Sequence, residues 1–248
     1  MCSAEIGNQP RIDGREMQSI EKLKTTDDLG EHGGGIWKKW PWTDSDHYEL
    51  MSNLILKVNY SIQDFNSTIN GGFSPNQKDT VYLVALATWI KDAYWQIKRS
   101  CLRKEIENDF EFSKQSELGD ASKYLQVVRS AVIAHPLNST RHQDYGFGTE
   151  GRICIDIRGK SLLDSFPNAV IFRITPKRFS RINCVGENDI ALMTCRNIRS
   201  TKEQKDKLHF ERCCLDMQDI RDSAELYIDA LYELDRHLGR IRRKDFIK

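Results

Sequence analysis

Arg129 and His135 are the two residues of this sequence whose chemistry most needs an explanation, because they stand near the two ends of an otherwise apolar stretch, residues 124–136. A guanidinium holds a phosphate through two parallel hydrogen bonds, and an imidazole exchanges a proton near neutral pH. Together they suggest phosphodiester chemistry. The structural alternative is an arginine paired with a core carboxylate and a histidine that caps the C-terminus of a helix.

Five residues separate Arg129 from His135. On a continuous α-helix this separation places the two side chains about 120° apart around the axis. Pro136 disfavours helical backbone at His135, so we expect the helix to end there and the imidazole to turn back toward the arginine. A second copy of the chain, related by a two-fold axis, is the other way to complete such a site.

A polar segment beyond Pro136 and one acidic residue further back extend the candidate site. The polar segment contains Asn138, Thr140, Arg141 and His142. It is interpreted either as a loop that positions substrate phosphates or as a solvated turn. Asp92 lies within an apolar stretch, where a carboxylate needs a partner. Arg129 is a natural partner, and the pair would either orient the guanidinium or serve as a structural salt bridge.

The elements that must position these residues follow from the spacing of apolar side chains. Four helices are predicted, over residues 43–69, about 75–112, about 121–134 and about 203–238. The first ends at the Asn70-Gly-Gly72 turn. The second is apolar around much of its circumference, which predicts a central position. A break at residues 118–121 is expected to separate the second helix from the third.

Three short segments between the third and fourth helices favour β-strands, namely residues 152–158, 169–175 and 189–194. The order of elements predicts a mainly α fold, in which a helical bundle carries a small β insertion, about 145–195, before the C-terminal helix. Residues 43–248 are expected to form this single domain. Residues 1–42 are interpreted as a flexible leader and a Trp-rich segment that docks onto the domain or onto a partner.

Composition limits the classes of protein to consider. The 248 residues include 37 Lys and Arg against 36 Asp and Glu, so any nucleic-acid surface must be a local patch. Seven cysteines occur without metal-binding spacing, and we expect neither a metal nor a cofactor. No secretory signal and no membrane-spanning run is visible. A cytoplasmic protein with reduced thiols is therefore expected.

Near the end of the predicted third helix, an arginine is followed by a polar residue, four further residues and a histidine. This arrangement resembles the HEPN superfamily (higher eukaryotes and prokaryotes nucleotide-binding). The resemblance covers residues 45–138 and the last helix. It implies an α-helical bundle, often dimeric, and a metal-independent ribonuclease of bacterial or phage-defence type. It also implies that Arg129 and His135 are catalytic, with Ser130 in support, and that single-stranded RNA, a second copy and an antitoxin or defence-system protein are partners.

In the chemistry that this resemblance implies, His135 is the general base for the ribose 2′-hydroxyl or the general acid for the leaving 5′-oxygen. Arg129 binds the scissile phosphate and stabilises the charge that develops on it. The product is a 2′,3′-cyclic phosphate. The alternative function is a non-catalytic helical module that binds nucleic acid, a nucleotide or a protein through the tryptophans and the β insertion.

Overall fold

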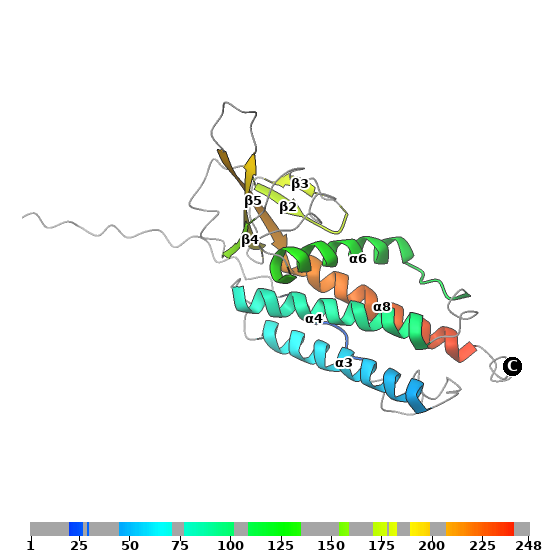
Figure 1. Cartoon of the computed structure of the whole chain (residues 1–248). Coiled ribbons are helices and arrows are strands. Elements are labelled where there is room, and N and C mark those ends of the chain that lie inside the picture. Colours follow the sequence, from blue (N-terminus) through cyan, green and yellow to red (C-terminus); the bar gives the residue numbers. More distant parts are fainter. Residues whose placement is uncertain are drawn as a thin grey trace, which may run out of the picture.

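Four long helices lie side by side, and a five-stranded sheet lies at the end of the bundle where the last helix begins (Figure 1). This computed structural model describes residues 20–26, 29, 45–70, 77–101, 109–134, 154–158, 171–177, 179–182, 189–198 and 207–240. The prediction of a mainly helical chain with a sheet before the C-terminal helix is confirmed. No helix in the described ranges is long and apolar enough to cross a membrane.

The helices are α3 (Ser45–Asn70), α4 (Gln77–Gln96), α6 (Gln115–Arg129) and α8 (Met217–Arg240). Two π-helical turns follow two of them, η1 (Ile97–Cys101) after α4 and η2 (Ser130–Ala134) after α6. Helix α4 packs against α3, α6 and α8. Its predicted central position is therefore confirmed, as is the end of the first helix at Asn70.

The bundle core consists of the apolar faces that helical periodicity predicts. On α3 the buried residues recur every three or four positions, at Met51, Ile55, Val58, Ile62, Phe65 and Ile69. Three fully buried tyrosines from α4, α6 and α8 lie in the same core, namely Tyr94, Tyr124 and Tyr227. The Tyr227 hydroxyl donates to the carbonyl of Leu118 at 3.3 Å, which ties α8 to α6.

Two predicted helix boundaries are wrong. The break expected at residues 118–121 lies inside α6, where Leu118 and Ala121 are fully buried. Gly119 costs a helix about 1 kcal/mol relative to alanine, and burial of its neighbours offsets this. The second helix does not reach Phe112, because residues 110–112 are not helical. Phe110 instead packs against the ring of His237, with centroids 5.5 Å apart.

The sheet has the strand order β1-β4-β5-β2-β3. Its strands are β1 (Cys154–Arg158), β2 (Ile171–Ile174), β3 (Phe179–Ile182), β4 (Asp189–Ile198) and β5 (Lys207–Asp216). The central strand β5 pairs antiparallel with β4 and parallel with β2. The three predicted strands correspond to β1, β2 and β4, whereas β3 and β5 were not predicted.

Strand β5 replaces the first part of the predicted fourth helix, so that prediction is wrong for residues 207–216. All ten of these residues pair with β4, and helix α8 begins only at Met217. The carboxylate of Asp216 accepts the backbone N–H of Gln218 at 2.9 Å, as an N-terminal cap does. The signal for the strand is the alternation of polar and apolar residues from Lys207 to Glu211.

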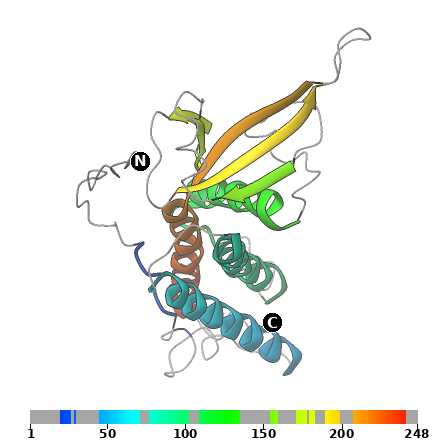
Figure 2. The same cartoon turned by 90° about the vertical axis from the view of Figure 1, so that its left-hand side faces the viewer.

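The two faces of the sheet have different surroundings. Consecutive strand residues point to opposite faces, and the adjacent cysteines of β5 show this division. Cys213 belongs to the core shared with the helices, whereas Cys214 packs with Ile171 and Ala191 on the other face. Both cysteines are fully buried. The end-on view shows the sheet above the helices, with α6 directly beneath it (Figure 2).

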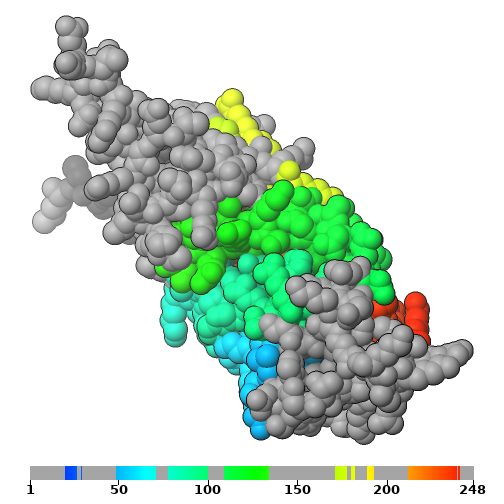
Figure 3. Space-filling model, turned by 45° about the vertical axis from the view of Figure 1, so that its right-hand side comes forward, coloured from blue at the N-terminus to red at the C-terminus, as the bar shows by residue number. Residues whose placement is uncertain are grey.

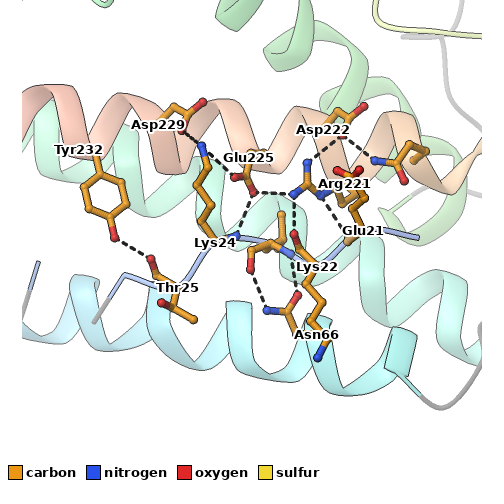
Figure 4. A network of polar contacts seen from close by, with 12 residues as sticks. Glu21, Lys22, Lys24, Thr25, Asn66, Arg221, Asp222, Glu225, Asp229 and Tyr232 are labelled. Atoms are coloured by element: carbon orange, nitrogen blue, oxygen red, sulfur yellow. Dashed lines mark hydrogen bonds and ion pairs between the residues drawn. The ribbon is translucent and has the colours of Figure 1, made fainter. Parts of the chain in front are cut away.

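Part of the predicted leader lies within the bundle. Residues 20–26 run in an extended conformation between α3 and α8 (Figure 4). Leu23, Thr26 and Leu29 are each no more than 2% exposed. The segment therefore contributes to the core although it precedes the first long helix.

Candidate functional site

Arg129 is the last residue of α6, and its side chain is exposed. Ser130, the next residue, is only 2% exposed. The backbone stays helical at this junction, because Ser130 has φ −62° and ψ −41° and its N–H bonds to the carbonyls of Gln126 and Val127. The two residues therefore face in different directions, with the guanidinium toward solvent and the hydroxyl toward the core.

The π-helical turn η2 continues the chain from Ser130 to Ala134. It buries Ala131 and Val132 and contacts both α4 and β1. Single π-helical turns insert one extra residue into a helix and frequently occur at functional sites. Because η2 ends at Ala134, the prediction that the third helix extends to that residue is confirmed. Figure 3 shows the surface of α6 between the β2–β3 strands and α4.

Asp92 is not the counterion of Arg129. Its carboxylate, which is 53% exposed, pairs with the amine of Lys91 at 3.2 Å. No ion pair joins Arg129 to another residue that the structure describes. The expectation that Asp92 needs a partner is therefore met locally, by the neighbouring lysine of α4, and not by Arg129.

The remaining predicted site residues lie outside the described ranges. They are His135, Asn138, Thr140, Arg141 and His142. The three tryptophans at positions 37, 40 and 42 also lie outside them. Arg129, Ser130 and Asp92 are therefore the predicted site residues whose positions the structure defines.

A second charged group of residues, which sequence reasoning missed, lies where the sheet meets α8. Arg173 of β2 forms an ion pair with Asp189 of β4, across the central strand β5. The carboxylate of Asp189 is 1% exposed. Burial, followed by the charge of Asp189, raises the pKa of the Cys214 thiol to about 12. The thiol is therefore protonated at neutral pH and unreactive.

Asp219, in the first turn of α8, belongs to the same charged group. Burial, followed by repulsion from Asp216, raises its pKa to about 6. The folded protein therefore binds a proton at this carboxyl that the unfolded chain releases near pH 4. The Asp219 carboxyl therefore makes folding less favourable as the pH rises from about 4 to about 6, because its charged form is penalised only in the folded state.

Replacing Asp219 with asparagine should remove this penalty. We expect Asp219→Asn to be more stable than wild type by about 1 kcal/mol at pH 8, after allowance for solvent screening. The difference should shrink as the pH falls from 6 to 4. Urea unfolding at pH 4, 6 and 8 measures it. A stability difference that does not change with pH would contradict the raised pKa.

Comparison of the chain with protein-family models, with curated proteins and with solved structures found no match. The functional argument therefore rests on the residues themselves.

Sequence reasoning also missed a pair of charges on the buried face of α8. Arg221 and Glu225, four residues apart, form an ion pair at 3.3 Å, and the two residues are only 9% and 8% exposed. A detectable signal existed, because both charges interrupt the apolar face of the last helix. Charges at such positions need further hydrogen-bond partners, and residues 20–26 supply them.

Proposed function

We propose that this protein is a metal-independent endoribonuclease of the HEPN type, which cleaves single-stranded RNA by attack of a 2′-hydroxyl on the adjacent phosphate. One observation carries the proposal. Arg129 is an exposed guanidinium at the end of the third long helix of a four-helix arrangement, on the chain that leads through η2 to His135. The resemblance to the HEPN superfamily implies such a location, near the end of a third bundle helix, for the arginine of the motif.

The exposure of Arg129 favours contact with a phosphate. A planar guanidinium donates two parallel hydrogen bonds to phosphate oxygens, and no described residue competes for it through an ion pair. Ser130 is buried and has hydrogen-bonding or electrostatic contacts of its own. We therefore assign Ser130 a positioning role at the α6–η2 junction, without direct contact with RNA.

The reaction needs one proton acceptor and one proton donor. His135 acts as one of these, and the 2′-oxygen attacks phosphorus while the 5′-oxygen leaves with a proton. The negative charge that accumulates on the phosphate oxygens is stabilised by Arg129. The products are a 2′,3′-cyclic phosphate and a 5′-hydroxyl. A second copy of the chain, as a homodimer, would supply the second Arg129–His135 pair.

RNA cleavage in the presence of a chelator tests this proposal. Wild-type protein is mixed with single-stranded RNA in EDTA, beside a variant that carries both Arg129→Ala and His135→Ala. We expect cleavage by wild type and none by the double variant. Equal cleavage by both proteins would reject the assignment of Arg129 and His135. No cleavage by either would reject the ribonuclease and favour the alternative, a non-catalytic helical module that binds nucleic acid, a nucleotide or a protein partner.

A further inference from the structure

The segment formed by residues 20–26 and Leu29, here called the inserted segment, has a burial pattern of its own. Its buried residues are Ile20, Leu23, Thr26 and Leu29, whereas residues 21, 22, 24 and 25 are exposed. Every third residue is therefore buried. This is the period of a polyproline II helix, not the period of two that a strand shows. A polyproline II segment has no internal hydrogen bonds, so its backbone depends on partners, apart from the turn in which the N–H of Leu29 donates to the carbonyl of Thr26 at 2.9 Å.

Those partners are side chains of α3 and α8 that bind the backbone of the inserted segment (Figure 4). The amide of Asn66 accepts the N–H of Leu23 at 2.8 Å and donates to the Leu23 carbonyl at 2.9 Å. From α8, Glu225 accepts the N–H of Lys24 at 3.1 Å, and the Tyr232 hydroxyl donates to the carbonyl of Thr25 at 2.7 Å. These contacts fix the path of the chain, and they do not depend on side-chain identity within the segment.

Arg221 extends this backbone recognition. Its guanidinium donates to the carbonyl of Glu21 at 3.2 Å and to the carbonyl of Lys22. The same guanidinium pairs with Glu225, and a buried ion pair is costly unless further hydrogen bonds satisfy its donors and acceptors. The inserted segment supplies two carbonyls to the arginine and one N–H to the glutamate. The Arg221–Glu225 pair is thus suited to a groove that holds an extended peptide.

Side-chain contacts add sequence preference to the groove. The amine of Lys24 lies 2.6 Å from Asp229 and 3.3 Å from Glu225. The hydrogen bond to Asp229 raises the pKa of this amine. Thr26 bonds to Asn59 of α3. These contacts favour a peptide with the pattern of Leu23, Lys24 and Thr26. In this pattern a lysine directly follows an apolar residue, and a threonine stands two places after the lysine.

The groove is open to solvent beside Lys24. A polar pocket of about 390 Å³ adjoins it, and its lining includes Lys24, Asp229, Tyr232 and Glu233. Lys24 itself is 58% exposed. A competing peptide can therefore make its first contacts beside Lys24, with Asp229 and Glu225, while Leu23 and Ile20 are still in place.

We propose that the groove between α3 and α8 is a recognition site for an extended peptide, that the inserted segment (residues 20–26 and Leu29) is its resident ligand, and that a separate peptide of the same pattern binds there by displacing it. Backbone hydrogen bonds give affinity in this mode of recognition, and pockets for particular side chains give specificity. The proposal is independent of the ribonuclease assignment, since none of its residues belongs to the Arg129 site.

The test uses the full chain with a weakened resident segment. Lys24→Glu places a carboxylate opposite Asp229 and Glu225, and because Lys24 is 58% exposed the fold should tolerate the change. A fluorescent peptide of residues 18–29 is titrated into wild type and into Lys24→Glu, with fluorescence anisotropy as the readout. The control peptide carries the Lys24→Glu change. Asn66→Ala combined with Lys24→Glu is the control for the groove.

We expect the wild-type peptide to bind Lys24→Glu at least about tenfold more tightly than it binds the wild-type chain, whose own segment competes for the groove. Binding should raise the Tm of Lys24→Glu in proportion to the logarithm of peptide concentration. Lys24→Glu should bind the control peptide at least about tenfold more weakly than the wild-type peptide. The protein that carries both Asn66→Ala and Lys24→Glu should bind the wild-type peptide at least about tenfold more weakly than Lys24→Glu does. Absence of saturable binding to Lys24→Glu up to about 1 mM peptide, or binding that Asn66→Ala does not weaken, would overturn the proposal.

Discussion

Replacing Arg129 with alanine is expected to slow RNA cleavage by about 100- to 1,000-fold, the usual loss when one preorganised donor to a developing negative charge is removed. The stability of the protein should change by less than about 0.5 kcal/mol, because Arg129 is exposed and makes no ion pair with a described residue. Cleavage rates at saturating RNA and urea unfolding curves measure the two quantities.

Lys123→Ala is the matched control for this variant. It removes an exposed positive charge from the same helix, six residues before Arg129. We expect it to weaken RNA binding slightly through the loss of one charge, with an unchanged rate at saturating RNA. If Lys123→Ala and Arg129→Ala lost activity equally, the effect would be one of general charge, and the catalytic role of Arg129 would be contradicted.

Replacing Asp189 with alanine is expected to have the largest effect on stability, about 3 kcal/mol, because it leaves Arg173 without its partner in a mostly buried place. The Asp189 side chain is 1% exposed, and its ion pair joins β2 to β4 across β5. Thermal and urea unfolding measure the loss. The exposed Asp222, which pairs with Arg221 at 3.0 Å, provides the control, since Asp222→Ala should cost less than about 0.5 kcal/mol.

A double replacement separates the ion pair from general packing. Asp189→Leu together with Arg173→Met removes both charges and keeps most of the buried volume, so we expect it to recover at least about half of the stability lost in Asp189→Ala. If the double variant were less stable than Asp189→Ala, packing around these residues, and not the unpaired charge, would explain the loss.

The helical core was predictable because the apolar residues of the long helices recur at helical spacing. Met51, Ile55, Val58 and Phe65 recur at helical spacing, and the buried residues of α3 follow that pattern from Met51 to Ile69. Strand β5 was not predictable by the same criterion, because apolar residues on both of its faces are buried, as Cys213 and Cys214 show. Burial on both faces removes the alternation that distinguishes a strand, and alternation remains only between Lys207 and Glu211.

The candidate site was predictable in part. Its position on the third helix depends on local periodicity, which places Arg129 at the end of α6. The partner of Asp92 was not predictable, because a lysine beside it in the sequence satisfies it as well as an arginine on another helix does. The inserted segment was missed because its buried residues recur every three positions, a period that neither a helix nor a strand shows.

The end groups of the cleaved RNA test the central claim most directly. Wild-type protein is incubated with a single-stranded RNA in EDTA, and the products are analysed by mass spectrometry. Attack by the 2′-hydroxyl, with Arg129 at the phosphate and His135 exchanging the proton, predicts fragments that end in a 2′,3′-cyclic phosphate and begin with a 5′-hydroxyl. Intact RNA, or fragments that carry a 3′-hydroxyl and a 5′-phosphate, would contradict it.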